Sequence, residues 1–194
     1  MSSHAAAAEP VILVFGDSLS AGYGLGRDTG WVSLLERQLA QEKLGYRVVN
    51  ASISGETTAG GVRRIESALA AHHPAVVILE LGANDGLRGL PNEQTRDNLN
   101  AMIAACKKQR ARVLLVGMQL PPNYGIAYTE KFRLIYPQLA VRHNKLALVP
   151  FMLEGLADQR DLFQADNFHP NAEAQPLLLQ NIWRHLQPLL NVRN

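Results

Sequence analysis

Cysteine is scarce in this 194-residue sequence, which excludes a disulfide-stabilised domain and a domain built on a cysteine-rich zinc site. The single thiol, Cys106, can form no disulfide within the chain, and zinc sites built from paired cysteines are excluded as well. Cys106 falls within a stretch of helical period, so we interpret it as a small apolar core residue rather than a reactive thiol.

An excess of charge of one sign is also missing. Lys and Arg total 19 against 17 Asp and Glu, a formal net charge of +2, and no basic run is present. This balance argues against nucleic acid as a partner.

Long apolar runs are missing as well, since no stretch approaches the ~18 apolar residues of a membrane span. The length and the 47% hydrophobic content fit one domain with a full core.

The first nine residues look different from the rest of the chain. The run from Ala5 to Ala8 resembles the small-residue end of a signal peptide, but the charged start and the long apolar middle are missing. We interpret residues 1–9 as a leader remnant or added cloning residues, and residues 10–194 as a single domain. The alanine run favours an exported protein, with a cytoplasmic protein as the alternative.

Short β-branched runs alternate with longer segments of helical period, as is typical of βαβ units. Strands are predicted over residues 11–15, 46–51, 75–81, 112–118 and 146–151. Apolar spacings of three and four predict helices around residues 30–44, 62–69, 99–106, 132–139 and 177–186. Pro137 suggests a kink or a break in the fourth. The alternation predicts an α/β fold, a three-layer αβα sandwich with a five-stranded parallel sheet, which binds ligands beyond the carboxyl ends of its strands.

Ser18 lies shortly after the first predicted strand, on a turn that Gly16 allows to be tight. A nucleophile at the mouth of a parallel sheet occupies such a position. Two other interpretations stay open: Ser18 can be the N-cap of the next helix, or the loop can bind a phosphate on its backbone amides. The loop lacks the lysine of a P-loop and the full glycine spacing of a dinucleotide site.

A serine nucleophile needs a histidine oriented by a carboxylate. Of the six histidines, His169 lies in the glycine-free loop 164–171 before the last helix, with Asp166 three residues earlier. In a turn, this spacing can fold the carboxylate onto the imidazole. The alternative is an aspartate that caps a local turn beside an unrelated histidine.

Acyl transfer also needs donors for the oxyanion of the tetrahedral intermediate. The loop after the second predicted strand contains Gly55, whose backbone amide is unhindered, and the loop after the third contains Asn84, a neutral side-chain donor. Either loop by itself is equally well an ordinary turn, because Asn, Asp and Gly are common in turns.

Four short segments, taken together, resemble a known family. Residues 16–20 (Gly-Asp-Ser-Leu-Ser), Gly55, residues 82–85 (Gly-Ala-Asn-Asp) and residues 166–170 (Asp-Asn-Phe-His-Pro) are similar, in order, to the four blocks of the SGNH hydrolases, also called the GDSL family. Residues 50–55, 81–88 and 122–125 resemble the bacterial thioesterase, lysophospholipase and arylesterase branch.

The resemblance implies the flavodoxin-like SGNH hydrolase fold and a role for each motif residue. Ser18 is then the nucleophile, His169 the general base and acid, and Asp166 its orienting carboxylate. The oxyanion hole is formed by the backbone amides of Ser18 and Gly55 and the side chain of Asn84. The implied reaction is hydrolysis of acyl esters and thioesters through an acyl-enzyme, without a metal or an organic cofactor.

The resemblance further implies a periplasmic monomer that acts on a small-molecule acyl ester or thioester, including a lipid substrate at a membrane surface. Segments 87–92 and 121–128 are expected to form the walls of the acyl site. The residues expected to contact substrate are Leu87, Pro121, Tyr124, Ile126 and Phe168. Two other functions stay open: a carbohydrate acetylesterase on the same fold, and a flavodoxin-like module that binds a phosphate or nucleotide.

Overall fold

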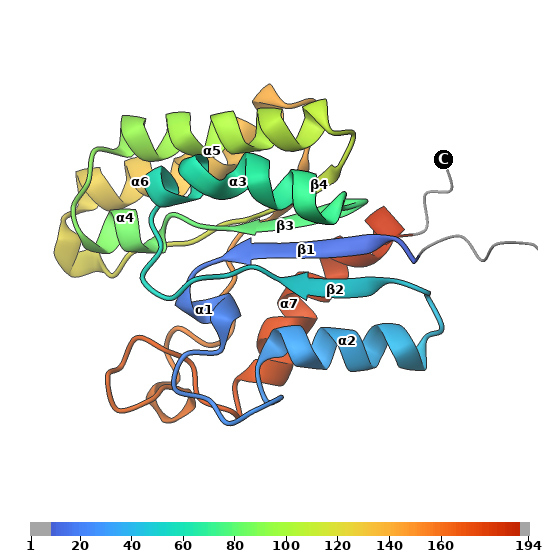
Figure 1. Cartoon of the computed structure of the whole chain (residues 1–194). Coiled ribbons are helices and arrows are strands. Elements are labelled where there is room, and N and C mark those ends of the chain that lie inside the picture. The colour runs from blue at the N-terminus through green and yellow to red at the C-terminus, as the bar shows by residue number, and fades with distance from the viewer. Residues whose placement is uncertain (1–8, 191–194) are drawn as a thin grey trace, which may run out of the picture.

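The computed structural model describes residues 9–190 (Figure 1). Apart from Glu9, the predicted leader segment lies outside the described residues. Five parallel strands form one sheet in the order β2-β1-β3-β4-β5. The strands are β1 (Val11–Gly16), β2 (Arg47–Asn50), β3 (Val76–Glu80), β4 (Arg112–Val116) and β5 (Ala147–Val149).

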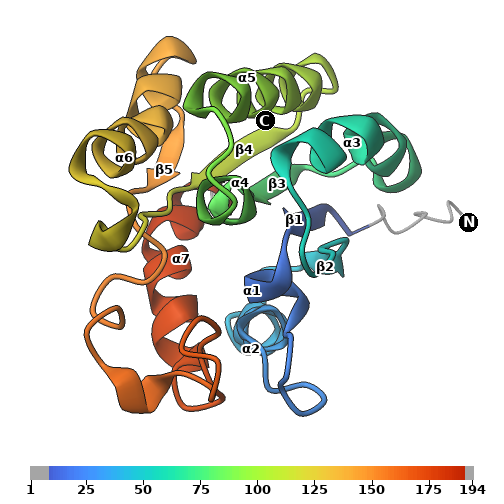
Figure 2. The same cartoon turned by 90° about the vertical axis from the view of Figure 1, so that its left-hand side faces the viewer.

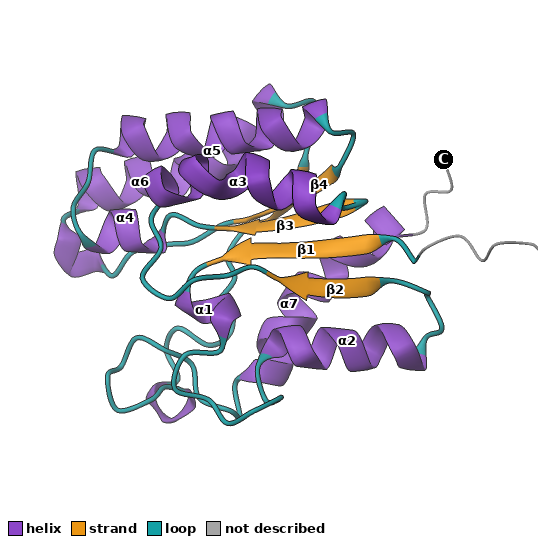
Figure 3. Ribbon diagram, in the orientation of Figure 1, coloured by secondary structure: helices purple, strands orange, loops and turns teal. Residues whose placement is uncertain are grey.

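Helices cover both faces of the sheet (Figure 3). One face carries α2 (Trp31–Gln41) and α7 (Gln175–Leu190), and the other carries α3 (Thr58–His72), α5 (Asn92–Lys108) and α6 (Ile126–Arg142). Four short helical segments interrupt the connections: α1 (Ser18–Ala21), α4 (Ala83–Leu87), η1 (Pro122–Tyr124) and η2 (Arg160–Leu162). The predicted three-layer α/β sandwich is confirmed.

The core follows from the apolar runs in the sequence. All residues of β1 and β3 are buried, as expected of strands that are covered by helices on both faces, whereas the edge strands β2 and β5 are partly exposed. Trp31, Phe15 and Phe132 are among the largest fully buried side chains. Cys106 is also buried, and burial raises the pKa of its thiol to about 12, so it stays a neutral core group.

Pro137 does not break its helix. The helix α6 runs without interruption from Ile126 to Arg142, so the predicted break is wrong. Buried side chains hold the helix on both sides of the proline, at Phe132, Ile135 and Tyr136 before it and at Leu139 after it. This packing compensates for the backbone hydrogen bond that proline cannot donate.

The strand order places one edge of the sheet where ligands are expected. The chain leaves β1 toward β2 on one side and returns to β3 on the other, so strand order reverses between β1 and β3. Figure 2 looks onto this edge, where α1 and α4 lie in front of the sheet. Clefts in open α/β sheets form at such reversal points. Within residues 9–190, no helix has the length and apolar character needed to cross a membrane.

Candidate active site

Ser18 is the first residue of α1, directly after β1. Asp17 caps this short helix, because its Oδ1 atom accepts the Leu19 backbone N–H at 3.0 Å. The helix ends at Gly22, whose φ of 76° lies in the left-handed region that glycine adopts without strain. The serine is therefore presented on a tight turn between a buried strand and a capped helix.

Two buried carboxyl groups lie beneath the nucleophile turn. Glu80 Oε2 accepts the Asp17 N–H at 3.2 Å and the Ser20 hydroxyl at 2.7 Å. Burial raises the pKa of Asp17 to about 6, and burial together with the nearby Asp17 raises the pKa of Glu80 well above its ordinary value. The close approach requires a glycine, since a Cβ atom at Gly16 would lie 2.5 Å from Glu80 Oε2.

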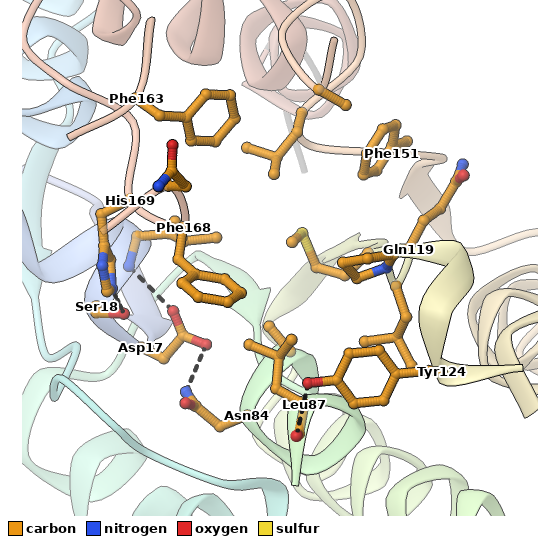
Figure 4. A pocket seen from close by; sticks show the side chains of 18 of the residues that line it. Asp17, Ser18, Asn84, Leu87, Gln119, Tyr124, Phe151, Phe163, Phe168 and His169 are labelled. Atoms are coloured by element: carbon orange, nitrogen blue, oxygen red, sulfur yellow. Dashed lines mark hydrogen bonds between the residues drawn. The ribbon is translucent and has the colours of Figure 1, made fainter. Parts of the chain in front are cut away.

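Ser18, His169 and Asp166 form a continuous chain of hydrogen bonds. His169 Nε2 lies 2.8 Å from Ser18 Oγ, and His169 Nδ1 lies 2.6 Å from Asp166 Oδ2. Ser18 and His169 are 151 positions apart in the sequence, but Figure 4 shows them side by side. The imidazole is therefore placed to take the proton of the Ser18 hydroxyl, which is the geometry of a nucleophile with its general base.

The loop before α7 folds tightly around Asp166. The second carboxylate oxygen, Oδ1, accepts the backbone N–H groups of Phe168 at 2.9 Å and His169 at 3.0 Å. Asn167 supplies the turn with a φ of 59°, a conformation that asparagine adopts more readily than most residues. Partial burial acts to raise the pKa of Asp166, but these N–H groups and the His169 ring lower it to about 2. Asp166 therefore stays ionised beside the imidazole.

The three expected oxyanion donors come from neighbouring segments. Asn84 Nδ2 lies 3.0 Å from Asp17 Oδ2 and 3.0 Å from the Glu56 carbonyl oxygen, which joins α4 both to the nucleophile turn and to the residue after Gly55. Gly55 has a φ of 77°. Within the described residues, no hydrogen-bond partner is found for the backbone N–H of Gly55 or of Ser18. Both amides are thus available to a ligand.

Side chains from two helices fix the loop that carries Gly55. Asp85 accepts the Thr58 backbone N–H at 2.9 Å and the Thr58 hydroxyl at 2.5 Å, which connects α4 to the start of α3. Arg64 Nε donates to Glu56 Oε2 at 2.7 Å, and its guanidinium lies 3.9 Å from the centroid of the Phe15 ring. The loop therefore has little freedom relative to Ser18.

A cavity of about 680 Å³ opens beside Ser18 and His169. Four of the five residues expected to contact substrate line it: Leu87, Pro121, Tyr124 and Phe168. Figure 4 shows the Phe168 ring on the Ser18 side of the cavity and Tyr124 on the opposite side. The Tyr124 hydroxyl donates to the Leu87 carbonyl at 3.1 Å, so the two expected walls are joined.

Ile126 lies outside the cavity lining, contrary to the prediction. It is the first residue of α6, and its side chain is 81% exposed. The preceding Gly125, with a φ of 89°, redirects the chain between η1 and α6. This turn separates Ile126 from Tyr124, although both belong to the same predicted wall.

A third wall of the cavity was not predicted. Phe151, Leu153 and Phe163, from the connection between β5 and α7, also line the cavity. Figure 4 shows Phe151 and Phe163 on the side away from Asn84 and Leu87. Their apolar side chains carry no signal that separates a cavity wall from an ordinary core. Glu80 was also missed, although an acid at the end of an otherwise apolar strand was a visible signal.

No group of three or more His, Cys, Asp or Glu side chains that could hold a metal ion occurs in the part of the chain that the structure describes. The polar residues that line the cavity include Ser18, His169 and Asn84, the residues expected to supply a nucleophile, its base and an oxyanion donor. The arrangement is suited to acyl transfer.

Comparisons with known proteins agree with this geometry. The chain is 51% identical over 184 residues to Esterase TesA of Pseudomonas aeruginosa, covering 95% of this chain and 91% of that protein. It is 42% identical over 186 residues to Thioesterase 1/protease 1/lysophospholipase L1 of Escherichia coli, covering 96% and 88%.

Solved structures show the same relationship. The crystal structure of the psychrotrophic esterase EstA from Pseudoalteromonas sp., inhibited by monoethylphosphonate, matches with a TM-score of 0.88 at 38% identity. The match covers 94% of this chain and 99% of that chain. Residues 14–176 match the model of the GDSL-like Lipase/Acylhydrolase family. The chain belongs to this family of SGNH hydrolases.

Proposed function

We propose that this protein hydrolyses acyl esters and thioesters through an acyl-enzyme on Ser18. The observation that carries the proposal is the unbroken chain from Ser18 Oγ through the His169 ring to Asp166, with contacts of 2.8 and 2.6 Å. A serine hydroxyl is a weak nucleophile until a positioned base takes its proton. His169 is that base, and its contact with Asp166 fixes the tautomer of the imidazole.

In the first step, Ser18 Oγ attacks the acyl carbonyl carbon while His169 Nε2 takes the hydroxyl proton. Asp166, whose pKa is lowered to about 2, remains a carboxylate and stabilises the imidazolium. The imidazolium then gives its proton to the departing alkoxide or thiolate. In the second step, a water molecule loses a proton to His169 and attacks the acyl-serine, which releases the acid and regenerates Ser18.

The negative oxygen of each tetrahedral intermediate needs hydrogen-bond donors. The free N–H groups of Ser18 and Gly55 can donate without rearrangement. Asn84 differs, because both hydrogens of its Nδ2 atom already have acceptors, Asp17 Oδ2 and the Glu56 carbonyl. Donation from Asn84 therefore replaces one of these two contacts as negative charge develops.

The cavity supports acyl or aryl substrates larger than acetate. Its volume of about 680 Å³ falls within the range of pockets that enclose drug-sized ligands, and apolar side chains such as Leu87 and Phe151 line it. These features favour acyl and aryl esters, thioesters and lysophospholipids at a membrane surface over acetylated carbohydrate. Asp17, whose pKa of about 6 leaves it mainly ionised at neutral pH, disfavours a phosphate ligand at the turn.

Covalent labelling tests the nucleophile. Intact-mass analysis after treatment with an alkyl phosphonate or sulfonyl fluoride should show one adduct on Ser18. The Ser18→Ala variant should show none, with kcat lowered by about 10⁴-fold or more and an unchanged melting temperature. Retention of more than a small fraction of the activity in Ser18→Ala would refute the mechanism.

A second experiment ranks the substrate classes. The same preparation is assayed on p-nitrophenyl esters of rising chain length, acyl-CoA thioesters and lysophospholipid.

We further propose that the protein acts as a monomer in the periplasm. The alanine run in residues 5–8 and the family resemblance support export, and the triad is assembled from one chain. Cell fractionation with a periplasmic marker enzyme and sedimentation of the purified protein test the two parts separately.

A further inference from the structure

The loop that carries the catalytic base has little apolar packing of its own. Residues 165–168 are all exposed, and the side chains of His169 and Asp166 are 24% and 38% exposed. Segments with few buried apolar contacts open easily unless hydrogen bonds restrain them. The short distance from His169 to Ser18 therefore needs a restraint other than burial.

Gln164 supplies one such restraint. Its Nε2 atom donates to the Tyr23 carbonyl at 2.8 Å and to the Pro170 carbonyl at 3.2 Å, and its backbone N–H donates to the His169 carbonyl at 2.8 Å. One carboxamide thus joins the segment after Ser18 to the residue that follows the base. The contact needs a glycine at position 24, because a Cβ there would collide with Gln164 Oε1.

Gln175, the first residue of α7, forms a second bridge, from the start of α2 to the residues that follow His169. Its Oε1 atom accepts the Trp31 backbone N–H at 3.0 Å, and its Nε2 atom donates to the carbonyls of Pro170 at 3.3 Å and Asn171 at 3.1 Å. The side chain is almost completely buried. The Pro170 carbonyl, directly after His169, is therefore held by both glutamines.

We propose that Gln164 and Gln175 are positioning residues that set His169 at hydrogen-bonding distance from Ser18. Both glutamines donate to the Pro170 carbonyl, directly after His169. On the other side, Gln164 contacts Tyr23 and Gln175 contacts Trp31, both C-terminal to Ser18. Neither side chain touches Ser18 Oγ or the His169 ring nitrogens in the hydrogen bonds of the described residues, so both act through the backbone around His169. This inference rests on the proposed function.

Loss of this restraint should slow the chemical step more than it weakens substrate binding. The cavity walls around Leu87 and Tyr124 do not depend on either glutamine, so KM should change by less than about threefold. Misplacement of a catalytic group by about 1 Å can cost about 10²-fold in rate. We therefore expect kcat of Gln164→Ala to fall by about 10-fold to 10²-fold.

A double-mutant cycle separates positioning from general structural damage. Gln164→Ala is measured alone and in a His169→Ala background, with an activated p-nitrophenyl ester to reveal residual activity. Gln38→Ala is the matched control, because Gln38 on α2 also donates through Nε2, but to Glu42 on the exposed surface. Gln164→Glu is a second variant that keeps the shape of the side chain and, when ionised, loses the donor. Thermal unfolding establishes that each variant is folded.

The proposal predicts that Gln164→Ala lowers kcat in the wild-type background but changes the residual rate of His169→Ala by less than about twofold. Equal losses in both backgrounds, or wild-type kcat in Gln164→Ala and Gln164→Glu, would overturn the positioning role and leave the proposed function standing. Wild-type activity in His169→Ala itself would overturn the proposed function, and the positioning role with it.

Discussion

Ser18 follows a strand that is buried along its whole length, whereas His169 lies in a loop of which residues 165–168 are all exposed. On the nucleophile side, the turn rests on buried Glu80 and starts from the middle of the sheet. On the base side, the position depends on hydrogen bonds from glutamine side chains and from the loop's own backbone. The two halves of one active site are thus held by different forces.

The aspartates of the two halves show the same difference. Burial raises the pKa of Asp17 to about 6, so the fold disfavours its charge. On the base side, donors from Phe168 and His169 outweigh partial burial and lower the pKa of Asp166 to about 2, so the fold favours its charge. Asp166, which contacts His169 Nδ1 at 2.6 Å, is therefore the carboxylate that the fold keeps ionised beside the imidazole.

After Ser18→Ala, the largest expected effect on catalysis is also on the nucleophile side. Asn84→Ala should lower kcat by about 10²-fold to 10³-fold, because one oxyanion donor is lost. Steady-state kinetics measure the change. Asn98→Ala is the matched control, since Asn98 donates to Thr58 Oγ1 outside the cavity and should leave kcat within about twofold. If Asn84→Ala lowered the melting temperature without a change in kcat, Asn84 would serve only to join the loops.

The next effect concerns pH and the buried acid. Asp17 has a pKa of about 6 in the folded protein against an ordinary value of 3.8, so its contribution to stability is complete below 3.8 and is lost as the pH rises through 6. At pH 7 this loss amounts to at most about 3 kcal/mol. Asp17→Asn removes the ionisable group and therefore this pH-dependent loss of stability. The free energy of unfolding of the variant, relative to that of the wild type, should rise between pH 4 and pH 7.

Urea unfolding at both pH values measures this difference, and the exposed Asp97→Asn is the control. Asp166 has the opposite sign: its contribution is present above pH 3.8 and is lost as the pH falls through 2, so it does not change between pH 4 and pH 7. A difference between Asp17→Asn and wild type that is independent of pH would contradict the assignment.

The smallest expected effects compare a side-chain change at a glycine on the buried nucleophile side with one in the exposed loop on the base side. Gly16→Ala places a Cβ against Glu80 Oε2 and should destabilise the fold by about 1–3 kcal/mol. Asn167→Gly, in the exposed loop at a φ of 59°, should change stability by less than about 1 kcal/mol. Chemical unfolding of both variants measures the contrast. Equal changes in the free energy of unfolding of the two variants would contradict the view that the nucleophile side is held by burial and the base side is not.

The sequence predicted the fold closely because its signals were local. Fully apolar runs such as that of β3 indicate buried parallel strands, and their alternation with helices fixes the layer order. Within the cavity, the segment containing Tyr124 was correctly assigned to a wall, but Ile126, two residues later, was not. The side chain that faces a cavity depends on the turn at Gly125, which periodicity does not describe.

By itself, the sequence determined the sandwich, the order of the strands along the chain and the residue types needed for acyl transfer, because each depends on short-range pattern or on the chemistry of single side chains. Only the tertiary structure decided that Glu80 lies beneath the nucleophile turn and that Gln164 reaches the Tyr23 carbonyl. These contacts join residues 63 and 141 positions apart. A hydrogen bond across such a separation leaves no periodic trace in either segment, since its geometry exists only after the sheet has brought the loops together.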